Sequence, residues 1–135
     1  MEDSINYSAI VIAAIVSLIF GFLWFTMFFK KAYMKDLGKT KEQMDKGPSL
    51  LVASSLQFMG NLLMAFVLAW LIQQLGYTSL TQTLQLTILI WLGFIVAVIG
   101  PFYAFQAYSL RFFLIIVGGV LGFLIINTII LTIWR

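Results

Sequence analysis

The chain has 135 residues, of which 62% are hydrophobic and 10% are charged, whereas soluble domains carry about 25% charged residues. It contains no Cys and no His, which excludes disulfides and thiolate metal sites and removes the commonest general base and metal ligand. The net charge of +3 is concentrated, because six of the eight Lys and Arg residues lie between Lys30 and Lys46. The composition therefore predicts an integral membrane protein.

The first membrane span is expected over residues 5–29, because a helix needs about 20 apolar residues to cross the bilayer core. Small residues recur at every fourth position of this span and share one helix face. Helices in lipid associate through close packing and polar contacts, since the burial of apolar surface gives no net gain there. We therefore expect another helix backbone to approach this face, which consists of Ala9, Ala13, Ser17 and Gly21.

Residues 30–48 are expected to form a short amphipathic loop between the first two spans. Its apolar side chains would lie on the lipid headgroups as far as Gly38, and a capping box of Thr40 and Gln43 predicts a short surface helix over 41–46. Three lysines are candidate contacts for anionic lipid headgroups, at up to about 1 kcal/mol each. The alternative is that they act only as a topology signal. These lysines are Lys30, Lys31 and Lys35.

The second span is expected over 49–75, opened by Ser49 and followed by Gly76. It carries polar side chains inside the bilayer, and Asn127 of the fourth span adds another. Such amides commonly form hydrogen bonds between helices. They could instead line a path for a solute, which would require an oligomer because four close-packed helices leave no pore. The candidate lining residues are Ser54, Gln57, Asn61 and Asn127.

The third span is expected over 80–105 and the fourth over 110–134. Ser79 and Gln82 form a predicted capping box for the third span, and Gly100-Pro101 should kink or break it near its end. Trp91 lies too deep for an interfacial belt, so we expect it to pack against another helix. In the fourth span Gly118 and Gly122 are predicted to allow close helix packing.

Orientation follows the distribution of Lys and Arg. The six lysines of the 30–48 loop and Arg111 lie on one side of the membrane, and Arg135 alone lies on the other. This asymmetry predicts a cytoplasmic loop and two outward-facing termini. Residues 1–135 are thus interpreted as one all-α membrane domain, an antiparallel bundle of four transmembrane helices.

The same sequence disfavours several classes of activity. The spans contain no carboxylate for proton coupling, and Asp36, Glu42 and Asp45 are expected to be solvated partners of nearby lysines. We therefore expect no enzymatic activity, cofactor or metal, and no binding of nucleic acid. The favoured hypothesis is a non-enzymatic membrane protein that acts through helix packing, as a homo-oligomer or an accessory subunit of a membrane complex. The alternatives are an oligomeric passive channel or carrier for a neutral solute or weakly coordinated ion, and a protein that binds anionic lipid.

Several short motifs carry a resemblance to a known family. They are Asn6-Tyr7, Gly21 with Trp24, a segment with Lys31, Met34 and Gly38, and Trp91-Leu92-Gly93-Phe94. In these motifs, most closely over residues 5–40, the chain resembles a bacterial membrane-protein family, domain of unknown function 1761. Phe25 stands where the family usually has Tyr, and Tyr33 where it commonly has Trp. The resemblance implies four spans in the bacterial cytoplasmic membrane and assigns no activity.

Overall fold

The structure, a computed structural model, describes residues 5–134. Four of its helices are long and apolar enough to cross a membrane, and no strand occurs among the described residues. The predicted all-α membrane fold is therefore confirmed. The predicted outward position of the termini rests partly on residues 1–4 and Arg135, which lie outside the described residues. The four spans are Tyr7–Phe28, Leu50–Leu75, Leu80–Phe105 and Leu110–Ile133.

The first two spans are joined by two short helices. The first span ends in a π-helical turn, η1, after which Phe29 leaves the helical conformation and the chain changes direction. The segment predicted to lie on lipid headgroups is helix α2, and the predicted capping box of Thr40 and Gln43 opens α3. In chain order these elements are α1 (Tyr7–Leu23), η1 (Trp24–Phe28), α2 (Lys30–Leu37), α3 (Lys41–Asp45) and α4 (Leu50–Leu75).

The third span is one long helix that widens in the middle. It consists of α5 (Leu80–Ile90), the π-helical turn η2 (Trp91–Val96) and α6 (Ala97–Phe105), and α7 (Leu110–Ile133) follows. Of the predicted kink or break at Gly100-Pro101, the break is wrong, because α6 runs through Pro101 to Phe105, and the kink stays a prediction. The irregularity lies about two turns earlier, in η2, and π-helical turns of this kind relax the hydrogen-bond ladder inside an otherwise regular helix.

Side-chain caps and left-handed residues set the ends of the spans. Ser49, Ser79 and Ser109 accept hydrogen bonds from amides in the first turns of α4, α5 and α7, as Asn6 does for α1. Gly38 and Gly76 end α2 and α4 with φ values of 71° and 68°, the conformation that glycine adopts without steric cost. The turn after α6 uses Ala107 in the same region, with φ 61°.

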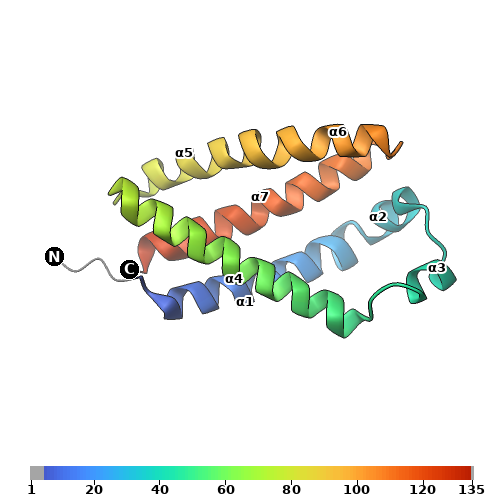
Figure 1. Cartoon of the computed structure of the whole chain (residues 1–135), viewed down its shortest axis with the longest axis horizontal. Coiled ribbons are helices and arrows are strands. Elements are labelled where there is room, and N and C mark those ends of the chain that lie inside the picture. The colour runs from blue at the N-terminus through green and yellow to red at the C-terminus, as the bar shows by residue number, and fades with distance from the viewer. Residues whose placement is uncertain (1–4, 135) are drawn as a thin grey trace.

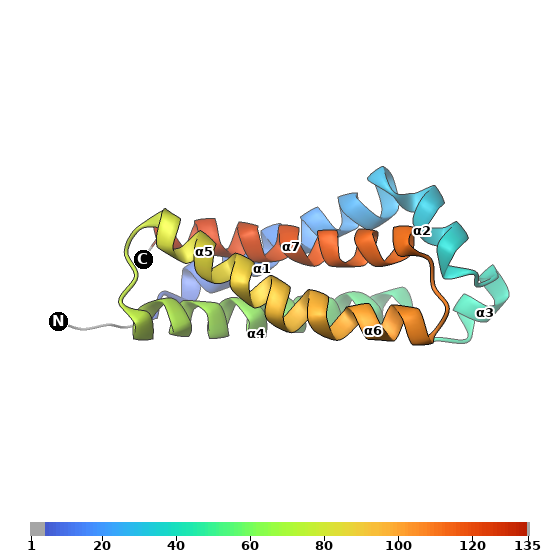
Figure 2. The same cartoon turned by 90° about the horizontal axis from the view of Figure 1, so that it is seen from above.

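Helix α7 is the centre of the arrangement. It packs against α1 and α4 on one side and against α5, η2 and α6 on the other, while α5 and α6 share no extensive contact with α1 or α4 (Figure 1). The 30–48 segment and the turn after α6 lie at one end of the molecule, and the turn between α4 and α5 lies at the other (Figures 1 and 2). The two groups of positive residues therefore share an end, as the orientation prediction requires.

The core is concentrated in the half of the molecule near the α4–α5 turn. Alanines of α1 with no exposed surface, Ala9 and Ala13, meet Ala65 and Leu68 of α4 and Leu131 of α7 there. Toward the other end α4 diverges from α6 (Figure 1), and none of its residues from 50 to 60 is buried. The third span is covered mainly on the side that faces α7.

Candidate functional site

A polar layer crosses the contact between α1, α4 and α7. The Ser17 hydroxyl donates to Oδ1 of Asn127 at 3.1 Å, and Nδ2 of Asn61 donates to the Ala14 carbonyl at 3.4 Å. Ser17, Asn61 and Asn127 have no exposed surface. Gln57 lies at the edge of the layer, where its Nε2 donates to Oδ1 of Asn61 at 2.8 Å. These hydrogen bonds join three spans in a medium that offers no water as a competing partner.

One buried polar atom of this layer lacks a partner among the described residues. Nδ2 of Asn127 is buried and makes no hydrogen bond to the described residues. The same amide uses its Oδ1 for Ser17, so its hydrogen-bonding capacity is only partly satisfied. An unsatisfied buried donor costs about 1–3 kcal/mol, which offsets part of the stabilisation from the hydrogen bond to Ser17.

A second polar contact joins α5 to α7 and was not predicted. The hydroxyl of Thr87 is hydrogen-bonded to that of Thr128, and Thr132 donates to Thr83 at 2.9 Å. Each of these two hydroxyls also lies within hydrogen-bonding distance of a carbonyl one turn earlier in its own helix, that of Thr83 for Thr87 and that of Leu124 for Thr128. Because each hydroxyl has one proton, one hydroxyl donates to the other and the second donates to its own carbonyl. In the sequence these residues read as ordinary β-branched members of apolar helices, since only the packing shows that they face one another.

Two tryptophans hold α7 from its two sides. Nε1 of Trp24 donates to the Ile115 carbonyl at 2.9 Å, and Nε1 of Trp91 donates to the Val117 carbonyl at 2.8 Å. Each tryptophan is the first residue of a π-helical turn. The structure thus places Trp91 against another helix, as the sequence analysis expected. Both residues belong to the motifs that carry the family resemblance.

The glycine faces of α1 and α7 accommodate aromatic rings. A Cβ atom at Gly122 would lie 2.3 Å from the Phe20 ring, and one at Gly21 would lie 2.9 Å from the Phe123 ring. Gly118 and Gly119 face the ring of Trp24 in the same way. At these glycines an aromatic side chain of the neighbouring helix fills the space that the missing Cβ leaves. Ala9, Ala13 and Ser17 are fully buried, the two alanines in the core cluster with α4 and α7 and Ser17 against Asn127.

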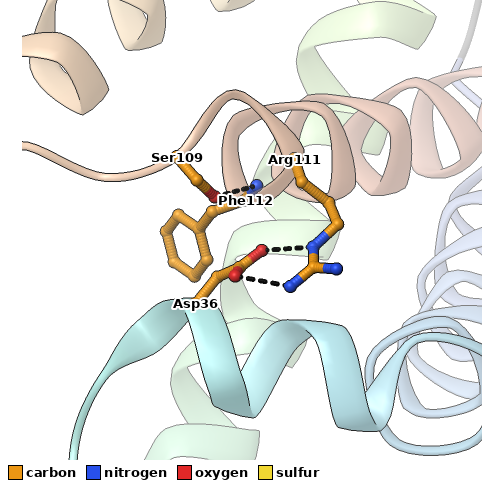
Figure 3. Close-up of polar contacts among 4 residues, drawn as sticks. All are labelled: Asp36, Ser109, Arg111 and Phe112. Carbon is orange, nitrogen blue, oxygen red and sulfur yellow. Dashed lines mark hydrogen bonds and ion pairs between the residues drawn. The ribbon is translucent and has the colours of Figure 1, made fainter.

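Helix α2 is attached to the start of α7 by an ion pair. Asp36 accepts two hydrogen bonds of 2.7 Å from Nε and Nη2 of Arg111 (Figure 3). The side chain of Asp36 is only 10% exposed, so it is not the solvated partner of lysines that the sequence suggested. Hydrogen bonding to Arg111, with a smaller contribution from the Ser109 hydroxyl, holds the pKa of Asp36 below its usual range.

Aromatic rings reinforce this attachment. Phe112 stacks on Tyr33 of α2 at 5.5 Å and on Tyr108 at 4.5 Å, measured between ring centroids. Burial, with the nearby Tyr108, raises the pKa of Tyr33. Tyr33, on the apolar side of α2, therefore packs on α7, whereas Met34 is exposed and the predicted contact of this side with headgroups stays a prediction. Lys30, Lys31 and Lys35 remain exposed and form no ion pair in the described part of the chain.

The four candidate lining residues do not share one surface. Gln57 is exposed and Ser54 is half-buried, whereas Asn61 and Asn127 are inaccessible. Lining of a path by all four would require the α1–α4–α7 contact to open. Within residues 5–134, no three His, Cys, Asp or Glu side chains are grouped closely enough to hold a metal ion.

Comparison with known proteins identifies one family. A family model described as a protein of unknown function, DUF1761, matches residues 8–132, which is most of the chain. No curated protein and no solved structure matches the chain. The matched range covers the four spans except for Tyr7 and Ile133 at their outer ends, and it contains both tryptophans that hold α7.

Proposed function

The chain belongs to the DUF1761 family of proteins of unknown function, and from its own geometry we propose a role in lateral association within the membrane. It is a non-enzymatic integral membrane protein of the bacterial cytoplasmic membrane that acts through helix packing. It works either as a homo-oligomer or as an accessory subunit of a membrane complex. The 30–48 loop faces the cytoplasm, because positive residues are retained on that side.

The observation that carries this proposal is the incomplete covering of the third span. The third span is 26 residues long, and no residue in the most apolar stretch of this span is buried. Its outer surface includes small residues at helical spacing, Gly93, Ala97 and Ala104, between large exposed side chains such as Phe94 and Phe102. A Cβ at Gly93 would meet no atom within 4 Å. Small residues between larger ones allow a neighbouring helix to approach closely in lipid.

The polar groups of the spans support the same role. Ser17, Asn61, Thr87 and Thr128 are used in hydrogen bonds between or within helices, which is how membrane proteins hold spans together. A passive channel is less well supported, because Asn61 and Asn127 cannot reach a pore between rigid copies of this chain.

The test is the composition of the purified particle. The protein is extracted in a mild detergent, its mass is determined, and single-molecule photobleaching counts copies in vesicles at low density. We expect two or more copies in each particle, or a co-purifying membrane subunit. A particle that is strictly monomeric in both measurements and carries no partner contradicts the proposal.

A second role, binding of anionic lipid, is favoured by the exposure of Lys30, Lys31 and Lys35. Exposed lysines beside the membrane attract anionic headgroups at about 1 kcal/mol each. Mass spectrometry of co-purified lipid compares the parent with a variant in which all three are Gln. A matched variant neutralises Lys39, Lys41 and Lys46 instead. Equal retention of anionic lipid by both variants and the parent removes this role.

A further inference from the structure

The core-facing stripe of α4 continues beyond the part that the chain itself covers. Ile72, Leu68, Ala65 and Asn61 are buried at intervals of three and four residues. Continued at the same spacing, the stripe reaches Gln57 and then Ser54, yet no residue from 50 to 60 is buried. From Ala65 onward the stripe consists of small and polar residues on both sides of this boundary, with Ala65 and Asn61 buried and Gln57 and Ser54 beyond them. The polar end of the interface within the chain is therefore continuous with a surface that the chain does not cover.

Gln57 makes this surface unfavourable to leave in lipid. One N–H of its amide is given to Asn61, and the described residues offer no partner to the other N–H or to Oε1. Gln57 lies seven residues into α4, about 10 Å along the helix axis. Since α4 is 26 residues long and exceeds the hydrocarbon thickness by about 9 Å, a centred helix places Gln57 inside the hydrocarbon. Polar groups at this depth require partners from protein.

The backbone next to Gln57 is open to a close neighbour. A Cβ at Gly60, one turn further along α4, would meet no atom within 4 Å. Ala53, one turn earlier, is small and exposed. A second helix can therefore come near enough for its side chains to reach the free amide.

We propose that this uncovered stretch of α4 binds the same stretch of a second copy of the chain. The inference rests on the proposed lateral association and names its partner. Copies insert in one orientation, so a two-fold axis along the membrane normal places Gln57 opposite the partner's Gln57 at equal depth. A primary amide is both donor and acceptor, and each can give its free N–H to the other's Oε1. In a symmetric dimer the second copy thus provides a matching amide, its own Gln57. An unrelated partner would have to carry a polar side chain at the same depth.

The absence of cysteine allows a direct test in native membranes. Ser54→Cys places a thiol on the proposed interface, and Ser55→Cys is a matched control at nearly the same depth, rotated about 100° around the helix. On oxidation we expect a disulfide-linked dimer from Ser54→Cys and little from Ser55→Cys. In photobleaching, Gln57→Leu should weaken dimerisation about tenfold by removing two interhelical hydrogen bonds. Gln85→Leu, at an exposed glutamine of α5, should leave dimerisation unchanged.

Failure of this interface differs from failure of the association itself. If the parent is oligomeric but cross-links from Ser55→Cys or from Ala97→Cys on the third span, the α4 interface is wrong and lateral association stands. An oligomer that Gln57→Leu leaves as stable as the parent has the same meaning. A parent that is monomeric and without partners at every density removes both proposals. The cross-link of Ser54→Cys leaves Gln57 intact, so it remains informative if Gln57→Leu does not fold.

Discussion

The contact between Phe20 and Gly122 predicts a large cost for adding a single methyl group. In Gly122→Ala the new Cβ would lie 2.3 Å from Cε2 and Cζ of Phe20, whereas carbon atoms in favourable contact are about 3.5–4.0 Å apart. The ring cannot retreat freely, because it packs edge-on against Phe123 at 5.8 Å and against Trp24 at 5.5 Å between centroids. The helices α1 and α7 must therefore separate, or the three rings must repack.

The magnitude follows from two opposing effects. Overpacking of a well-packed core costs about 1–3 kcal/mol. Replacement of Gly by Ala inside a helix stabilises the helix by about 0.8–1.0 kcal/mol, because Ala loses less backbone entropy on folding. Because the ring is held on two sides, we expect the overpacking to dominate and Gly122→Ala to lose about 1–2 kcal/mol of unfolding free energy. Gly60→Ala is the control at a dilution where the chain is monomeric, since its Cβ meets no atom of the same chain within 4 Å, and we expect it to gain about 0.5–1 kcal/mol there.

The assay is reversible unfolding in dilute detergent, followed by tryptophan fluorescence. Trp24, one of four tryptophans, lies against Gly118 and Gly119, so separation of α1 from α7 contributes to the change in emission. The double variant Phe20→Ala/Gly122→Ala should recover part of the loss, because the smaller side chain leaves room for the methyl group. If Gly122→Ala is as stable as the parent, or gains as much as Gly60→Ala, the ring does not hold these helices together.

Three further predictions use the same preparation. Ala107→Gly should raise the unfolding free energy by about 1 kcal/mol, because the left-handed conformation is unfavourable for a residue with a Cβ. Gly76→Ala should lower it by a similar amount for the same reason. An unfolding midpoint that falls for Ala107→Gly or rises for Gly76→Ala would refute this. In a double-mutant cycle, Ser17→Ala and Asn127→Ala should show a coupling of about 0.6–1.7 kcal/mol, as interhelical hydrogen bonds do in membranes, whereas strict additivity would mean that they contribute independently. Because the pKa of Asp36 is lowered in the folded state, its stabilisation of α2 is complete above the ordinary carboxyl pKa of about 3.9 and is lost as the pH falls through the lowered value. Proteolysis of the 38–48 segment should therefore accelerate in strong acid for the parent and for the control Asp45→Asn. Asp36→Asn should be cleaved quickly at every pH. If Asp36→Asn instead shows the pH dependence of the parent, the ion pair does not hold α2.

The spans and their ends could be predicted from sequence because they depend on local chemistry. A run of apolar residues, a capping serine or a glycine after the last turn acts within a few residues of itself. Ser49 and Ser79 accordingly occupy the capping positions that the sequence indicated. Gly38 ends α2 for the same reason.

Contacts between spans were harder to predict, because they depend on which faces meet. Asp36 and Arg111 are 75 residues apart, and each had a nearer explanation, as a partner of lysines or as a topology signal. The glycines of α1 and α7 are equally compatible with a backbone or a ring as neighbour, and only the positions of Phe20, Phe123 and Trp24 decide between them. The threonine pairs of α5 and α7 required the relative rotation of two helices, which apolar composition leaves undetermined.

The central position of α7 imposes an order on assembly during synthesis. It is the last of the four spans to leave the ribosome, yet every other span docks against it. Helices α1 and α4 contact each other directly, so this pair can form as soon as both have entered the bilayer. The third span has its extensive contacts with α7 alone and must wait in lipid or in the insertion machinery until α7 arrives. A nascent chain arrested before Leu110 should therefore carry a folded α1–α4 pair beside an unpacked third helix. This is the stage at which the third helix is available for binding by a membrane chaperone.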